Sequence, residues 1–240
     1  MLSKNQVKFI RSLKKKKFRQ ANQLFLAEGI KVVEELLSSS FKHHKIYSTA
    51  SYQNPLKVSD LQIITEKELG MISDFTNPNQ VIGIFEIPLE KELQNTGLTV
   101  ALDGINDPGN LGTIIRLCDW FGVTQLICSE NTVDCFNPKV VQASMGSLTR
   151  VAIYYVDLAE YLSKDSRVIY GTFLDGENIY NTSHEPNSVI VLGNEANGIS
   201  DSIKALVQKK ITIPQFGEQQ QTESLNVAMA TAIFLSEFRR

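Results

Sequence analysis

Short apolar runs alternate with helix-like segments from Leu98 to the end of the chain. A short apolar run indicates a buried strand, whereas apolar residues spaced three or four apart indicate a helix. The predicted strands cover residues 98–102, 125–128, 151–155, 168–171, 188–192 and 210–213. The predicted helices cover residues 111–121, 139–148, 158–162, 201–207 and 225–238. This alternation predicts an α/β domain over residues 98–240, with a mainly parallel sheet covered on both faces.

The pattern before Leu98 predicts a smaller module. Residues 1–20 place apolar side chains among cations, which predicts one short, basic amphipathic helix. The next predicted elements are a helical stretch and three short strands, at residues 30–37, 45–47, 62–64 and 81–85. They predict a small α/β module over residues 21–88. The polar stretch that ends in Gly97 predicts a linker over residues 89–97.

Charge is distributed unevenly along the chain. Residues 1–20 hold eight Lys or Arg and no acidic residue, although the whole chain has a net charge of −2. Residues 1–97 carry a net charge of +4, and residues 98–240 carry −6. A basic N-terminus on an acidic body favours a polyanionic partner. The alternative is a solvated helix that keeps the protein soluble.

Composition narrows the class of protein. The length of 240 residues, with 42% apolar and 21% charged residues, predicts an ordinary globular chain of one large or two modest domains. No apolar run approaches the ~18 residues of a membrane span, so we expect no membrane partner. Three cysteines without a CxxC pair and only three histidines predict no disulfide framework and no metal site. The same cysteine pattern favours a cytoplasmic location.

A turn-rich segment ahead of the predicted helix at 111–121 is the first candidate for chemistry. The apolar face of that helix is formed by Ile114, Leu117, Cys118 and Phe121. Arg116 falls on the opposite face, near Gly109 and Gly112, where a cation can approach a backbone or a phosphate closely. The alternative is that Asn110 caps the helix and Arg116 is merely solvated.

Two later loops are the other candidates. A strand runs directly into Gly193, and Glu195 then lies at its carboxyl end, where ligands bind in open α/β sheets. Neither a GxGxxG turn nor a P-loop is present, and Ser200 is predicted to cap the next helix. In the last loop Ser224 is predicted to cap the C-terminal helix. Asn226, in its first turn, is harder to explain by packing.

Together, and in this order, the three segments resemble motifs one, two and three of the SpoU-type RNA 2′-O-ribose methyltransferases of the SPOUT superfamily. The matching text spans residues 107–116, residues 192–195 with Gly198, and residues 213–214 with 224–227. Residues 137–147 also look like this family. The resemblance covers residues 98–240, while residues 21–88 look like a ribosomal-protein-L30e-like RNA-binding module.

The resemblance implies methyl transfer from S-adenosylmethionine to a ribose 2′-hydroxyl in structured RNA, with ribosomal RNA favoured over transfer RNA. It also implies a C-terminal trefoil knot and a homodimer formed through the knotted domain, with the active site near the interface. The implied cofactor contacts are Leu192, Gly193, Gly198, Ile213 and Leu225, with Thr172 and Leu174 in addition.

The resemblance also implies roles for five polar residues. Arg116 lies beside the 2′-hydroxyl, where a guanidinium, which stays protonated, would stabilise a developing alkoxide rather than act as a base. Asn110 and Asn226 would orient Arg116 and the loops. Ser224 would contact the ribose. Glu195 would pair with Arg116 and is a candidate proton acceptor.

Two positions depart from the family pattern, and two other readings remain open. Residues 218–222 lengthen the loop before Ser224, and Gln142 stands where many relatives carry Arg. Trp120, one turn beyond Arg116, is predicted to anchor a dimer interface or, alternatively, to stack a flipped base. The competing readings are a knotted RNA-binding or ribosome-assembly protein without catalysis, and a generic nucleotide-dependent α/β enzyme.

Overall fold

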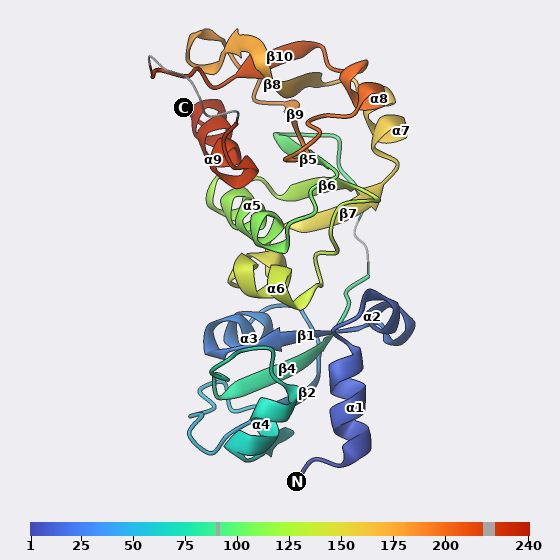
Figure 1. Ribbon diagram of the computed structural model, residues 1–240, viewed down its shortest axis with the longest axis vertical. Helices are drawn as coiled ribbons and strands as arrows, with labels where there is room; N and C mark the ends of the chain where they lie inside the picture. Colours follow the sequence, from blue (N-terminus) through green and yellow to red (C-terminus); the bar gives the residue numbers. More distant parts are fainter. Residues whose placement is uncertain (90–91, 218–223) are drawn as a thin grey trace. The chain divides into compact units, whose positions relative to one another are not determined.

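The computed structural model describes residues 1–89, 92–217 and 224–240, which divide into two compact units (Figure 1). The first unit comprises Met1–Leu89 together with Asp134–Thr149. The second comprises the described residues of Glu90–Val133 and of Arg150–Arg240. Each unit has its own sheet.

The first unit is built on a four-stranded sheet in the order β1-β4-β2-β3. Its strands are β1 (Leu24–Glu28), β2 (His43–Ser48), β3 (Leu61–Ile63) and β4 (Val81–Glu86). Its helices are α1 (Lys4–Ser12), α2 (Lys16–Asn22), α3 (Ile30–Leu37), α4 (Glu66–Ile72) and α6 (Pro138–Ser144), with a 3₁₀ turn η1 (Ser147–Thr149). β4 is antiparallel to β1 and β2, and β3 is parallel to β2. The predicted small α/β module is therefore present.

The single helix predicted over residues 1–20 is wrong, because the segment forms two helices. Ile10 and Leu13 are fully buried in the core of the first unit, and Lys15 is extended, with φ −99° and ψ 131°. The side chain of Arg19 is only 2% exposed and donates hydrogen bonds to the carbonyls of Leu13 and Lys14 at the break. Its Nη2 also lies 2.5 Å from Asp134 Oδ2. Arg19 is thus a buried structural cation and not part of a basic surface.

Residues 134–149 pack within the first unit, whereas the sequence placed them in one domain spanning residues 98–240. α6 packs against β1, and the ring of Phe136 lies 4.8 Å from that of Phe25. The helix predicted at residues 139–148 ends at Ser144, because Met145 and Gly146 take positive φ values of 50° and 93°. A backbone with positive φ leaves the right-handed helical region.

The second unit contains a six-stranded sheet in the order β10-β8-β9-β5-β6-β7, and every neighbouring pair is parallel. The strands are β5 (Thr99–Asp103), β6 (Gln125–Ser129), β7 (Ala152–Val156), β8 (Val168–Asn178), β9 (Ser188–Gly193) and β10 (Lys209–Thr212). The helices are α5 (Pro108–Trp120), α7 (Leu158–Ser163), α8 (Asp201–Lys204) and α9 (Val227–Phe238), with a 3₁₀ turn η2 (Ile179–Asn181). The predicted mainly parallel sheet is confirmed.

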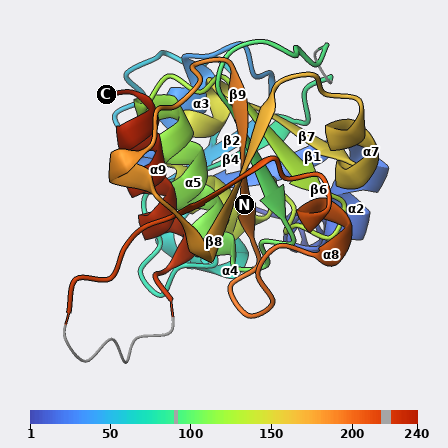
Figure 2. The ribbon, with the colours of Figure 1, turned by 90° about the horizontal axis from the view of Figure 1, so that it is seen from above.

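Helices cover both faces of this sheet. α5 and α9 lie on one side, and α7 and α8 lie on the other (Figure 2). Asn226 and Asn110 are hydrogen-bonded where α9 and α5 begin, and Arg239 Nε donates to the carbonyl of Phe121 where both end, at 2.8 Å. α5 and α9 therefore run side by side in the same direction. The resemblance implied a trefoil knot in this unit, and residues 218–223 of the chain between β10 and α9 lie outside the described residues.

The predicted linker over residues 89–97 is partly bound to the second unit. The backbone N–H of Gln94 donates to Gln125 Oε1 at 3.2 Å, and that of Gly97 donates to Asn187 Oδ1 at 2.8 Å. Residues 90 and 91 lie outside the described residues. Residues 92–97 are therefore an extension of the second unit and not a free connection.

Candidate active site

Asparagine side chains at the N-termini of α5 and α9 are the centre of the candidate site. The N-cap of α5 is Asp107, whose carboxylate accepts from the N–H of Asn110 at 2.8 Å. Asn110 is thus in the first turn, so the alternative in which Asn110 caps this helix is wrong. Likewise, Asn226 caps α9 by accepting from the N–H groups of Ala228 and Met229, whereas Ser224 lies two residues earlier and is exposed.

Three loops that are far apart in the sequence meet through a chain of hydrogen bonds. Asn226 Nδ2 donates to Asn110 Oδ1 at 2.9 Å, and Asn110 Nδ2 donates to Glu195 Oε1 at 2.7 Å. The structure therefore brings together one residue from each of the three motifs. Because Asn226 also fixes the start of α9, this chain couples the position of α9 to the loop after β9.

Arg116 is exposed and forms no hydrogen bond or ion pair with the residues that the structure describes. The expected pair with Glu195 is not formed there, because Glu195 accepts from Asn110 instead. Arg116 lies six residues along α5 from Asn110, about 9 Å further along the axis and about 120° around it. A guanidinium without a protein partner keeps its five N–H donors for a substrate.

The glycines near Arg116 differ from one another. Gly109 is exposed, as expected, but Gly112 is buried on α5, which packs against α9. One turn before Arg116, Gly112 is still on the same side of α5, at the border with its buried side. Of the two glycines, only Gly109 is exposed beside Arg116.

Close backbone contacts define the loop after β9. Asn194 and Gly198 exchange two backbone hydrogen bonds, of 3.0 and 2.8 Å, and Gly198 has φ +67°. A Cβ on Gly193 would lie 2.2 Å from the carbonyl carbon of Gly198, so no side chain fits there. Asn194 Nδ2 donates to the carbonyl of Gly104 at 2.7 Å. The loop is thus a tight, preformed turn attached to the end of β5.

Several expected cofactor residues gather at the carboxyl edge of three adjacent strands. Leu192 is buried at the end of β9, and Thr172 Oγ1 on β8 donates to the carbonyl of Val191 at 3.1 Å. Ile213 follows β10 directly, while Leu225 precedes α9 and is half exposed. Exposed apolar side chains beside a glycine turn suit an uncharged adenosine, and the loop needs no phosphate cradle. These residues therefore fit S-adenosylmethionine.

Leu174 lies further along β8, where it is exposed. Its carbonyl accepts from Thr212 Oγ1 at 3.3 Å. This contact places Leu174 beside the end of β10, next to Ile213.

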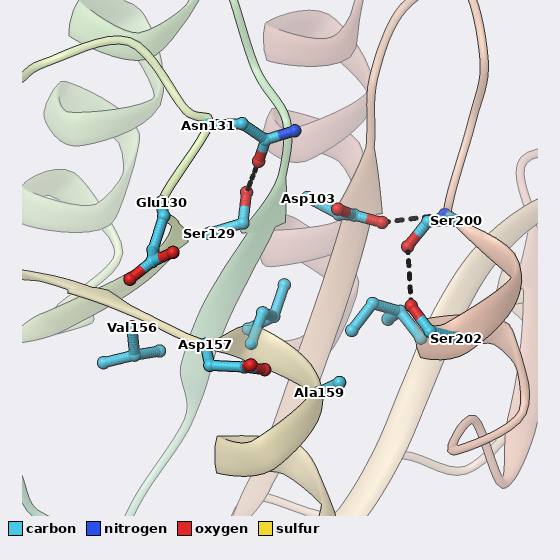
Figure 3. Close-up of a pocket in the computed structure, with 11 residues that line it drawn as sticks. Asp103, Ser129, Glu130, Asn131, Val156, Asp157, Ala159, Ser200 and Ser202 are labelled. Carbon is cyan, nitrogen blue, oxygen red and sulfur yellow. Dashed lines mark hydrogen bonds between the residues drawn. The ribbon is translucent and has the colours of Figure 1, made fainter.

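A pocket of about 260 Å³ lies at the carboxyl ends of β5, β6 and β7 (Figure 3). Its polar lining is Asp103, Ser129, Glu130, Asn131, Asp157, Ser200 and Ser202. Asp103 Oδ2 accepts from the N–H of Ser200 at 2.7 Å, which holds the far end of the loop after β9. Ser200 begins α8 as expected, but its side chain makes no capping hydrogen bond. Sequence reasoning missed Asp103, although an aspartate at a strand end was a signal.

The described residues contain neither a metal-binding cluster nor a helix suited to cross a membrane. Within residues 1–89, 92–217 and 224–240, no group of three or more His, Cys, Asp or Glu side chains is arranged to hold a metal ion. None of the helices in that part of the chain is long and apolar enough to cross a membrane.

Comparison with known proteins assigns both parts of the chain. The family model for the SpoU rRNA Methylase family matches residues 97–236, and that for the MRM3-like substrate binding domain matches residues 4–83. The 23S rRNA (guanosine(2553)-2′-O)-methyltransferase RlmP of Bacillus subtilis is 30% identical, over 99% of this chain and 97% of its own.

Solved structures agree with this assignment. A putative RNA methyltransferase of the TrmH family from Porphyromonas gingivalis has a TM-score of 0.89 and 39% identity, covering 100% of this chain and 98% of its own. An AdoMet-bound rRNA methyltransferase from Sinorhizobium meliloti has a TM-score of 0.86 and 30% identity, covering 100% and 95%. The reading as a generic nucleotide-dependent enzyme is thereby set aside. The chain belongs to the SpoU rRNA methylase family and is an RNA methyltransferase that uses S-adenosylmethionine.

Proposed function

We propose that this protein methylates a ribose 2′-hydroxyl in ribosomal RNA. The observation that carries the proposal is the chain of hydrogen bonds from Asn226 through Asn110 to Glu195. Arg116 lies on the same helix as Asn110 and has no hydrogen-bond or ion-pair partner among the described residues. The length match to RlmP, whose name specifies 23S rRNA, supports ribosomal over transfer RNA.

In this mechanism the protein positions the reacting groups and stabilises charge. Bound S-adenosylmethionine supplies an electrophilic methyl group. The guanidinium of Arg116 stabilises negative charge on the 2′-oxygen as its proton leaves, and it also binds a flanking phosphate. Glu195 keeps Asn110 in place through Oε1, and its carboxylate is the proposed proton acceptor. Ser224, exposed ahead of α9, is proposed to contact the ribose.

The test is transfer of labelled methyl groups from S-adenosylmethionine to ribosomal and transfer RNA that lack native modifications. We expect label at 2′-O positions of ribosomal RNA. Label in transfer RNA alone would refute the proposed substrate. Tight RNA binding without label in either RNA would favour the alternative of an RNA-binding or assembly protein without catalysis.

Gly193→Ala is expected to impair both cofactor binding and catalysis. The new Cβ would overlap the backbone of Gly198, so the loop after β9 must shift. A displacement of about 1 Å can lower a rate on the order of 100-fold. Calorimetric titration with S-adenosylmethionine and a methyl-transfer assay measure the two effects.

Gly70→Ala is the matched control, because a Cβ there meets no atom within 4 Å. It should leave both quantities unchanged. Unaltered cofactor binding in Gly193→Ala would show that the loop after β9 does not hold the cofactor.

RNA binding by the first unit is proposed to rest on cations of α1 and α2. Arg19 is buried and Lys14 is paired with Asp74, so the basic surface is smaller than the sequence suggested. Exposed cations of this segment include Lys4, Lys8, Arg11, Lys15 and Lys17. This smaller set is still large enough for several phosphate contacts.

Lys4→Gln combined with Lys8→Gln is expected to weaken RNA binding and to reduce its salt dependence. Each lost phosphate contact should lower the slope of log affinity against log salt by about 0.7 to 0.9. Binding titrations at several salt concentrations give the slope. A double variant of the exposed Lys164 and Lys204 in the second unit is the control. Equal slopes in both variants would contradict an RNA surface on α1.

The proposal includes a homodimer formed through α5 and α9. Trp120 on α5 is 84% exposed and Met229 on α9 is 60% exposed, and large exposed apolar side chains on packed helices mark interaction sites. Analytical ultracentrifugation of Trp120→Asp tests this proposal. If the wild type is a dimer and Trp120→Asp is a monomer, the proposed interface is supported. If Trp120→Asp remains a dimer, the interface is rejected.

The cytoplasmic location and the effects of the two departures from the family pattern stay predictions. The cytoplasmic location is supported by three buried cysteines that form no disulfide. Gln142 lies on α6 in the first unit, and its Oε1 is buried without a hydrogen-bond partner among the described atoms. The lengthened loop at residues 218–222 lies outside the described residues.

A further inference from the structure

An exposed pair of aromatic rings lies on the second unit and takes no part in the site described above. Phe216 is 82% exposed and Tyr180 is 41% exposed. Their ring centroids are 6.4 Å apart, with an angle of 33° between the ring planes. Large aromatic side chains left in water at this level call for a partner.

The pair lies close in the fold to the expected cofactor residues. Phe216 lies in the segment that follows β10, three residues after Ile213 and two after Pro214. Tyr180 belongs to η2, which packs against α9, the helix that Asn226 caps. The two rings therefore connect the segment after β10 to η2. The Ile179 carbonyl of η2 lies 3.0 Å from His184 Nε2, and His184 stacks on Phe238 at the C-terminal end of α9.

The chemistry of the rings selects the occupant. The glycine turn and Leu192, Ile213 and Leu225 are assigned to S-adenosylmethionine in the proposed site. The remaining ligand of an RNA methyltransferase is its RNA, and unstacked bases of RNA bind on aromatic side chains. Every base has a flat apolar face, so two tilted rings can hold one without reading its identity.

We infer that Phe216 and Tyr180 form a stacking platform for an unpaired nucleobase of the RNA substrate. The inference rests on the proposed function, because it assigns a binding role beside the same active site. The platform binds a base of the RNA substrate next to the segment that carries Ile213. Phe216, the more exposed ring, supplies the main contact, and Tyr180 lies beside it.

Substitutions at Phe216 separate stacking from simple apolar packing. Phe216→Ala should weaken binding of unmodified ribosomal RNA roughly 5- to 100-fold, the range found for loss of one stacked base. Phe216→Leu keeps apolar bulk without an aromatic face and should be nearly as weak. Phe216→Trp should bind like the wild type. All three variants should keep their affinity for S-adenosylmethionine and their oligomeric state.

Tryptophan fluorescence reports the stack directly, because the chain has one native tryptophan, Trp120. In a Trp120→Phe background, Phe216→Trp should show quenching when RNA is added, whereas the background alone shows none. A purely structural role of Phe216 would not produce this signal.

Three results would overturn the inference: unchanged RNA affinity in Phe216→Ala, a parallel loss of cofactor affinity, or loss of the wild-type oligomeric state. The second would make Phe216 a cofactor contact, and the third would make it part of an interface between copies. RNA affinity is measured independently of methyl transfer. A wild-type protein that methylates no ribosomal RNA would therefore refute the proposed function without deciding the role of Phe216.

Discussion

Arg116→Ala is expected to lower methyl transfer by at least about 100-fold, and to leave binding of S-adenosylmethionine unchanged. Loss of one group that stabilises a developing oxyanion typically costs 100- to 1,000-fold in rate, that is, about 3 to 4 kcal/mol. Stability should change by less than about 0.5 kcal/mol, because Arg116 is exposed and contacts no other described side chain through a hydrogen bond or an ion pair. Single-turnover methyl transfer with saturating cofactor isolates this effect.

Two variants make the result specific to the guanidinium. Arg116→Lys retains the charge but loses the planar donor fork, so an intermediate rate is expected. Arg240→Ala removes an arginine from the C-terminus, outside the site, and should behave as the wild type. A near-normal rate in Arg116→Ala would remove Arg116 from the mechanism and direct attention to Glu195.

Arg167→Met is expected to destabilise the second unit by about 3 to 5 kcal/mol, the usual cost of leaving one partner of a buried ion pair alone. Arg167 is buried, and its Nη2 lies 2.6 Å from Asp165 Oδ2. The side chain of Asp165 is fully buried. Arg167 Nη1 donates to the carbonyl of Gly97 at 2.9 Å and to Thr99 Oγ1 at 2.8 Å, and Nη2 also donates to the hydroxyl of Tyr161 at 2.9 Å. Urea unfolding at pH 7 measures the loss.

The dependence on pH has a definite sign. Burial alone would raise the pKa of Asp165, but hydrogen bonds from Arg167 lower the pKa below its usual value. In the wild type, Asp165 therefore stabilises the fold above pH about 4, its unfolded pKa, and that stability is lost as pH falls through the lower folded pKa. Arg167→Met removes the side-chain hydrogen bonds and the charge of Arg167, while burial, the backbone N–H of residue 167 and the Tyr161 hydroxyl remain. The pKa of Asp165 therefore rises relative to the wild type, and protonation relieves the unpaired charge.

The difference in unfolding free energy between wild type and Arg167→Met should thus be smaller at pH 5 than at pH 8. The double variant that adds Asp165→Asn tests the cause. It removes the charge while keeping an oxygen for the backbone N–H of Arg167, and it should recover part of the stability. A pH-independent difference, unaffected by Asp165→Asn, would mean that lost packing and not the charge is responsible.

The strands of the second unit were predictable because an apolar run in the sequence corresponds directly to a strand that is buried along its length. β5, β6 and nearly all of β9 are buried along their length, so an apolar run identifies them without further information. α4 was not predicted, although the capping box of Thr65 and Glu68 marks its start. The C-terminal extension of β8 was also missed, because its outer residues are partly exposed and polar.

The break within residues 1–20 could not be predicted from a helical period. It depends on Arg19, whose guanidinium meets Asp134 from a segment 115 residues away. A cation in a basic run is ordinarily solvated, and only a carboxylate brought there by the fold makes its burial favourable. The same long-range packing moves residues 134–149 into the first unit.

The sequence by itself determined the family, the parallel sheet and the three loops that carry Arg116, Glu195 and Asn226, because these follow from ordered motifs and local apolar patterns. The tertiary structure alone decided how those loops connect. Asn110 and Asn226 pair because α5 and α9 lie parallel, and Glu195 then binds Asn110 and not Arg116. Hydrogen bonds depend on distances of a few tenths of an ångström between distant segments, and no local pattern encodes such distances.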